Sequence, residues 1–170
     1  VAVLGENVVD CVVGEHGQLH SSLGGSPLNV ALALSRQQHQ VCYLSPLSAD
    51  HFGDAFARLL QHEQITLGAA RSSRPSSLAI VHIDSQGQPR YSLYRQGIAD
   101  RDITLAALCA AVPPDTQLLH SGSLALDTAD SAVVTPFLQW VVRQGIALSI
   151  DINVRLAAIS DVAAYRTTLP

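Results

Sequence analysis

Short apolar runs alternate with stretches of helical periodicity along this chain of 170 residues. The opening run is stopped by Gly5 and is typical of a buried parallel strand, whereas the residues from Ser26 onward place apolar side chains on nearly every face of a helix, which is expected to be buried. Strands are predicted at 1–4, 41–47, 116–122 and 147–153, and helices at 26–36, 50–60, 104–112 and through 141–145, the last beginning near Thr135 or kinked at Pro136. This order predicts an α/β fold, and nothing firm is predicted beyond Leu156.

Two further stretches alternate apolar and polar residues, as half-exposed strands do. Residues 10–20 turn around Gly14 and Gly17, and residues 78–84 and 90–95 are joined by the turn-forming sequence SQGQP. These hairpins predict a small sheet that stands off the main one, with its strands within about 11–20 and 77–95. We find no linker or internal repeat, so residues 1–170 are expected to form one domain.

Composition narrows the function classes. With 48% hydrophobic and 14% charged residues the chain can bury a core, and its net charge of -4 with ten scattered Lys and Arg argues against a nucleic-acid partner. The chain has no apolar run of membrane-spanning length and no signal-peptide pattern, so we expect a cytoplasmic protein without a membrane partner. Cys11, Cys42 and Cys109 are expected to be buried thiols, and the histidines show no metal-ligand spacing.

Polar residues follow several of the predicted parallel strands at their carboxyl ends. In open parallel sheets small ligands bind beyond this edge, so the recurrence of such residues predicts a small-molecule site there. The residues are Glu6, Asn7 and Asp10 after the first strand, His120, Ser121 and Ser123 at the LLHSG strand, and Asp151, Asn153 and Arg155 after the ALSI strand.

The sequence GGSPLN adds a helix start to the same edge. Ser26 is a candidate cap with Pro27 at the first helical position, and Gly24 and Gly25 would let a polar ligand approach the main chain. Asn29 in the first turn could donate and accept hydrogen bonds. The phosphate-loop pattern GxxxxGK[ST], the dinucleotide pattern GxGxxG and the nucleophile elbow GxSxG are all absent.

Several motifs together resemble one family. The pattern GG-x-x-x-N, here Gly24 to Asn29, runs into ALALSR, and GENVVD, SADHFGDAFARLL, YSLYRQGIAD and DINVR follow the family's order along the chain. On these motifs the chain resembles the N-terminal portion of a ribokinase-like (PfkB) carbohydrate kinase of the fructokinase-like group. The resemblance implies a doubly wound, mainly parallel sheet with a small β-sheet lid.

The same resemblance implies ATP-dependent phosphorylation of a sugar hydroxyl and a set of substrate-binding residues. A positively charged side chain at the floor between sugar and nucleotide would stabilise the negative charge of the substrate or the phosphoryl group. The implied sugar contacts are Asp10, Gly24, Gly25, Asn29, Tyr94, Arg95, Asp100, Asn153 and Arg155. Lid sheets of this kind leave a strand edge available, so a homodimer through the lid is also expected.

One departure from the family's pattern matters. The family's catalytic base is an Asp in a GAGD motif, and its magnesium and adenine sites lie in the same C-terminal half, yet neither GAGD nor N-x-x-E occurs here. The chain is therefore expected to carry the sugar-binding half, with no catalytic or metal-binding residue of its own, while ATP and Mg²⁺ bind mainly outside it. Alone it should be inactive, because phosphoryl transfer depends on that positioning and charge stabilisation.

Two alternatives to a fructokinase-like enzyme stay open from the sequence. One is a kinase for another acceptor, such as 2-keto-3-deoxygluconate or an aminoimidazole riboside. The other is a non-catalytic sugar-binding or regulatory protein. The preference for fructose comes from the motifs GGSPLNVA, LYRQGIAD and DINVR.

Overall fold

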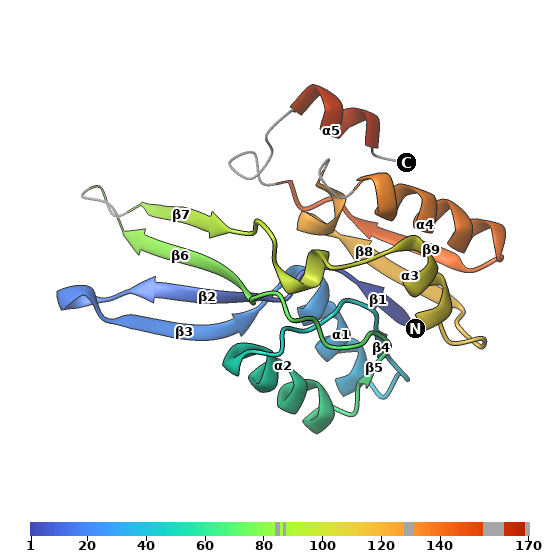
Figure 1. Ribbon diagram of the computed structural model, residues 1–170, viewed down its shortest axis with the longest axis horizontal. Helices are drawn as coiled ribbons and strands as arrows, with labels where there is room; N and C mark the ends of the chain where they lie inside the picture. Colours follow the sequence, from blue (N-terminus) through green and yellow to red (C-terminus); the bar gives the residue numbers. More distant parts are fainter. Residues whose placement is uncertain (84–85, 87, 128–130, 155–161, 169–170) are drawn as a thin grey trace.

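The chain folds into two β-sheets with helices on both faces of the larger one (Figure 1). The computed structural model describes residues 1–83, 86, 88–127, 131–154 and 162–168. The larger sheet, sheet A, has the strand order β5-β4-β1-β8-β9, and all of its pairings are parallel. Its strands are β1 (Ala2–Leu4), β4 (Cys42–Tyr43), β5 (Thr66–Leu67), β8 (Leu118–Gly122) and β9 (Ala147–Asp151).

Helices cover sheet A on both faces, as the doubly wound prediction requires. On one face α1 (Ser26–Arg36) and α2 (His51–His62) share a core cluster with Val3, Tyr43 and Phe56. On the other face α3 (Leu105–Ala111) and α4 (Ser131–Arg143) enclose a second cluster, which the short C-terminal helix α5 (Val162–Thr168) joins through Tyr165. The doubly wound α/β architecture predicted from the sequence is confirmed.

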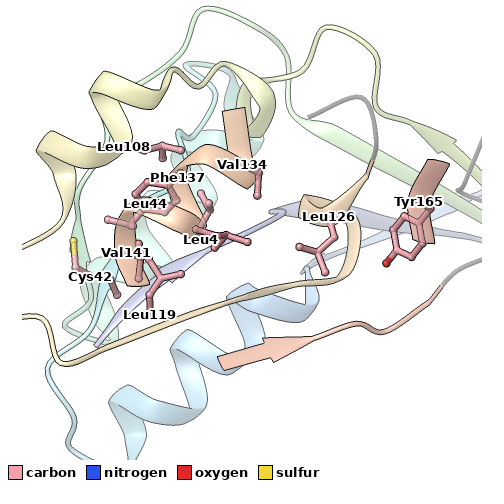
Figure 2. Close-up of a cluster of buried hydrophobic side chains, with 12 residues drawn as sticks. Leu4, Cys42, Leu44, Leu108, Leu119, Leu126, Val134, Phe137, Val141 and Tyr165 are labelled. Atoms are coloured by element: carbon pink, nitrogen blue, oxygen red, sulfur yellow. The ribbon is translucent and has the colours of Figure 1, made fainter. Parts of the chain in front are cut away.

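Figure 2 shows how tightly the second cluster is held. Leu4 and Leu119 point from β1 and β8 toward Phe137 and Val141 of α4, and each of these side chains is at most 1% exposed. Full burial of a large apolar side chain stabilises a fold by about 1.5–3 kcal/mol. This packing fixes the carboxyl ends of β1 and β8 relative to each other.

The two predicted hairpins form the separate sheet B, which extends away from sheet A in Figure 1. Its strands are β2 (Val8–Val13), β3 (Leu19–Gly24), β6 (Ser77–Ile83) and β7 (Pro89–Tyr94), in the order β3-β2-β6-β7. The β2–β3 and β6–β7 pairs are antiparallel, and β2 pairs with β6 in parallel. The first hairpin spans 8–24 rather than 11–20, so Asp10 lies within a strand of sheet B.

Several boundaries differ from the sequence-based ones. The predicted strand 41–47 is shortened to β4 at Cys42–Tyr43, with Leu44 still donating to the Val3 carbonyl, and Pro46 has no N–H with which to extend the ladder. Only Pro27, Leu28 and Ala31 of α1 are buried, because the helix packs against the sheet with one face, so the expectation of a fully buried helix is wrong. Helix α4 begins at Ser131, and Pro136 lies inside it.

Short 3-10 turns and caps complete the connections. They are η1 (Glu15–Gly17), η2 (Ala99–Arg101) and η3 (Ser123–Leu126). The predicted cap of α2 is confirmed: Asp50 accepts a hydrogen bond from the Gly53 N–H at 2.8 Å. The same carboxylate accepts from Ser76 at the start of β6, so it joins α2 to sheet B. No helix in the described ranges is long and apolar enough to cross a membrane.

Candidate functional site

The carboxyl ends of β1 and β8 meet at the point where the strand order of sheet A reverses. From β1 the chain proceeds to β4 and β5 on one side and returns to β8 and β9 on the other. Such a reversal opens a crevice in which α/β proteins bind their ligands. Here the crevice lies beside the junction with sheet B, because β2 begins at Val8, only a few residues after β1 ends at Leu4.

Glu6 occupies the centre of this crevice. Its side chain is 3% exposed, and Oε1 accepts a 2.9 Å hydrogen bond from the N–H of Ser26, the first residue of α1. Burial raises the pKa of the Glu6 carboxyl, and the Ser26 N–H, the Arg95 guanidinium and the Ser123 hydroxyl oppose that rise. Oε2 has no hydrogen-bond partner among the described residues.

The start of α1 differs from the sequence-based prediction. Gly25, with φ +128°, is the N-cap, and Ser26 is the first helical residue, so the expected Ser26 cap is wrong. A Cβ on Gly25 would lie 2.2 Å from the Glu6 carbonyl oxygen, so glycine is needed for the close passage of the chain's own backbone. The partial positive charge at the start of α1 also faces a carboxylate of the chain itself, that of Glu6.

Asp10 lies on β2, and its carboxylate lies next to the Cα of Gly24. A Cβ on Gly24 would lie 2.4 Å from the Asp10 Oδ2, so the missing side chain leaves room for the carboxylate. Burial raises the pKa of the Asp10 carboxyl, yet Asp10 has no hydrogen-bond or salt-bridge partner within the described ranges. An acceptor that is partly buried and unpartnered is available to a ligand that donates hydrogen bonds.

Asn29 lies close by, in the first turn of α1. Its backbone N–H donates to the Gly25 carbonyl at 2.9 Å, which closes that turn, and its side chain is exposed. The amide can therefore donate to and accept from the same ligand. The structure thus places Asp10 against Gly24, and Gly25 and Asn29 in the adjoining start of α1.

Arg95 and Asp100 bring a second group of charges to the crevice. They follow β7, and the Arg95 Nη2 lies 3.0 Å from the Asp100 Oδ2, with the two side chains 11% and 2% exposed. Both line a small cavity of about 10 Å³, together with Gly5, Glu6 and Arg101. The predicted proximity of Arg95 and Asp100 is therefore seen in the structure, as an ion pair.

The third segment of the crevice follows β9. Asn153 has a φ of +38°, and its Nδ2 donates to the Ser123 Oγ at 3.2 Å. The neighbouring His120 is buried, and its Nδ1 lies 3.1 Å from the Ser149 Oγ. Burial lowers the pKa of His120, against the opposing effect of Asp151. Asn153 therefore hydrogen bonds to Ser123, whose hydroxyl interacts with Glu6, whereas His120 is buried against Ser149 of β9.

Not every predicted residue joins this group. Tyr94 pairs with Leu78, whereas Asp10 pairs with Ala79, which in turn pairs with Leu93. Successive strand residues point to opposite faces, so Tyr94 lies on the face of sheet B opposite Asp10, where it is 60% exposed. Arg155 lies outside the described residues. In the described ranges no three His, Cys, Asp or Glu side chains are grouped to hold a metal ion.

A larger groove of about 270 Å³ lies elsewhere, lined by Leu44, Gly68 and Leu108 among others. Its charged side chains already have partners: Arg71 pairs with Asp54 at 2.7 Å, and Asp102 with Arg74 at 3.1 Å. The crevice, with the unpartnered carboxylate of Asp10, is the better candidate for a site of recognition.

Glu6 is the residue that the motif-based prediction left out of the sugar contacts. Its place directly after the first strand marked it as a residue of this edge, but its contact with Ser26 joins positions 20 residues apart. The supporting residues Ser45 and Tyr43 were also missed. The Ser45 Oγ accepts from the Gly5 N–H at 2.9 Å, and the Tyr43 hydroxyl donates to the Gly5 carbonyl at 2.7 Å.

Comparison with known proteins points to one family. The sequence model described as pfkB family carbohydrate kinase matches residues 1–170. A fructokinase of Klebsiella pneumoniae is 30% identical over 158 residues, which is 90% of this chain and 50% of that protein. The probable fructokinase-2 of Arabidopsis thaliana is 28% identical over 166 residues, again 50% of its length.

Solved structures agree on the fold. The fructokinase of Xylella fastidiosa with bound ATP superposes with a TM-score of 0.88 at 23% identity, covering 99% of this chain and 54% of that one. The PfkB protein of Polaromonas sp. JS666 gives 0.80 at 19% identity, with 98% and 60% covered. The chain therefore spans about half the length of the relatives it matches.

Proposed function

The chain belongs to the pfkB family of carbohydrate kinases, and on that premise we propose that the protein carrying it transfers the γ-phosphoryl group of ATP to a hydroxyl of fructose. In that reaction the sugar oxygen forms a bond to the γ-phosphorus, the bond to ADP breaks, and the hydroxyl proton leaves to a base. The residues described above would bind and orient the sugar, since such transfer relies on positioning.

The observation that carries this proposal is the open carboxylate of Asp10 above Gly24, beside the exposed amide of Asn29. A carboxylate accepts hydrogen bonds from sugar hydroxyls, and an amide both donates and accepts. We propose that Gly24 and Gly25 let the sugar approach the backbone and that Arg95, with Asp100, contacts it from the sheet B side. The position of Tyr94 on the far face does not support a direct contact.

Asn153 and Arg155 are proposed to form the floor between the sugar and the transferred phosphate, where a guanidinium would offset negative charge. The hydrogen bond from the Asn153 amide to the Ser123 hydroxyl supports this position for Asn153. Among the described residues no three His, Cys, Asp or Glu side chains are grouped for Mg²⁺, and the sequence holds neither GAGD nor N-x-x-E. We propose that the catalytic base and the sites for Mg²⁺ and the nucleotide lie outside residues 1–170. A relative solved with bound ATP supports ATP as the phosphoryl donor.

The test is turnover by the protein expressed from its complete coding sequence. With Mg²⁺ and ATP we expect ADP release that depends on fructose, and none from residues 1–170 alone. A panel with 2-keto-3-deoxygluconate and an aminoimidazole riboside separates the other acceptors. Turnover of no sugar, combined with calorimetric sugar binding, would contradict the enzyme and favour a non-catalytic sugar-binding protein.

We also propose that two copies pair through sheet B. Val12 and Tyr91 lie on the same face, because both are aligned with Val81, and they are 43% and 59% exposed. Apolar side chains exposed on an open sheet favour association. Sedimentation velocity of the complete protein should show a dimer that Tyr91→Lys weakens, while Tyr94→Lys on the other face should not. A wild-type monomer at micromolar concentration would contradict this pairing.

A further inference from the structure

Two carboxylates converge on one guanidinium in the crevice. The Asp100 Oδ2 lies 3.0 Å from the Arg95 Nη2. The Glu6 carboxylate is buried, at 3% exposure, and lies close enough to Arg95 for the two charges to interact. Both carboxylates and Arg95 line the same cavity of about 10 Å³, which holds no more than a water molecule. At this depth charges act strongly on one another, because little water screens them.

The other cation of the cavity is also compensated. Arg101 lies 3.9 Å from the Asp127 Oδ2 and donates to the Arg95 carbonyl at 3.4 Å. Among the described residues, Arg95 therefore has the carboxylates of Asp100 and Glu6 near it, and Arg101 has that of Asp127. An anionic ligand would meet repulsion here and would find the buried arginine already paired.

Polar atoms of both signs in this buried cluster remain open to a ligand. The Arg95 Nε, a donor, and the Glu6 Oε2, an acceptor, have no hydrogen-bond partner among the described residues. A hydroxyl or a water molecule can accept from the first and donate to the second, whereas a carboxylate can only accept. The unmet hydrogen-bonding capacity of the cluster therefore matches one uncharged hydroxyl or water molecule better than an anionic group.

The geometry points to Asp100 and Glu6 as positioning residues that set substrate specificity: by compensating the charge of Arg95 they admit uncharged sugars and reject sugar acids. This inference rests on the proposed sugar kinase function and extends it to the class of acceptor. It assigns to a pair of carboxylates the choice between fructose and acids such as 2-keto-3-deoxygluconate.

The test compares an uncharged sugar and a sugar acid in the complete protein. Asp100→Asn keeps the size of the side chain but removes its charge, and Glu6→Gln also keeps an oxygen for the Ser26 N–H. For each variant we expect the inhibition constant of 2-keto-3-deoxygluconate, divided by the KM for fructose, to fall roughly tenfold, since the Arg95 guanidinium loses a compensating carboxylate and can pair with that of the acid. A loss of packing alone would weaken both ligands and leave this ratio unchanged.

Two controls isolate the effect. Asp54→Asn removes the same charge from the more exposed pair with Arg71, in which neither residue lines the cavity of Arg95, and should leave the ratio within about twofold of wild type. In an Arg95→Gln background, Asp100→Asn should no longer favour the acid, because no guanidinium is released.

The outcomes separate the two levels of the proposal. An unchanged ratio in both variants of an active enzyme would overturn the specificity role. Wild-type protein that binds the sugar acid as tightly as fructose would overturn it without any variant. Wild-type protein that phosphorylates no sugar would instead overturn the proposed function.

Discussion

Asp10→Ala in the complete protein is expected to raise the KM for fructose by about 100-fold or more while changing the KM for ATP by less than about threefold. Each hydrogen bond from a sugar hydroxyl to a carboxylate is worth about 1.5–3 kcal/mol, and loss of two such bonds gives a change of this size. The carboxylate leans over Gly24 with no partner in the described part of the chain, so its loss breaks no internal contact that the structure shows. Initial rates at varied fructose and ATP provide the measurement.

Stability distinguishes this role from a structural one. Burial raises the pKa of Asp10 above its unfolded value, so the ionised form destabilises the fold at neutral pH, and this cost disappears as the pH falls and the carboxyl is protonated. Asp10→Ala and the isosteric Asp10→Asn should therefore unfold at no lower urea concentration than wild type at pH 7. Equal losses of sugar and ATP affinity, together with lower stability, would show that Asp10 supports the fold instead.

Gly25→Ala is expected to destabilise the chain by about 3–5 kcal/mol, which combines a left-handed backbone strain with a steric overlap. The residue has φ +128°, and the new methyl would lie 2.2 Å from the Glu6 carbonyl oxygen, which belongs to backbone and cannot rotate away. Relief of this contact must move the end of β1 or the start of α1. The shift of the urea midpoint at unchanged slope measures the loss.

Gly145→Ala is the matched control for this substitution. Gly145 has a positive φ of +75° but has no atom within 4 Å of the added Cβ, so only the backbone strain of roughly 1–2 kcal/mol remains. If the two variants lost equal stability, steric crowding at Gly25 would be excluded as the reason for its glycine.

The layered architecture could be predicted from the sequence because its elements carry strong local signals. Residues 1–4 are an apolar run, residues 147–153 place an apolar residue at every second position from Leu148, the cap at Asp50 starts the second helix, and the alternation in 78–95 separates the second sheet from the first. The short strands β4 and β5 are weaker, since two residues show no period. Their boundaries depend on pairing with β1 rather than on their own sequence.

The candidate site was predicted only in part, because its centre depends on contacts between distant segments. The glycines before α1 indicated a close approach to a helix start, but periodicity alone cannot show that the approaching anion is Glu6. The short spacing of Arg95 and Asp100 in the sequence indicates only that they lie near each other. Their ion pair depends on the burial of both side chains, which the sequence pattern does not show. Tyr94 is not part of the candidate site, because the alternation of side chains along β7 places it on the face of sheet B opposite Asp10.

The central claim is that these residues hold a sugar for phosphorylation, and the identity of the product tests it most directly. The complete protein incubated with fructose, ATP and Mg²⁺ should form a fructose monophosphate in an amount equal to the ADP released, as read by mass spectrometry and phosphorus NMR. ATP consumption without a phosphosugar, or no consumption with any sugar of the panel, would contradict the account.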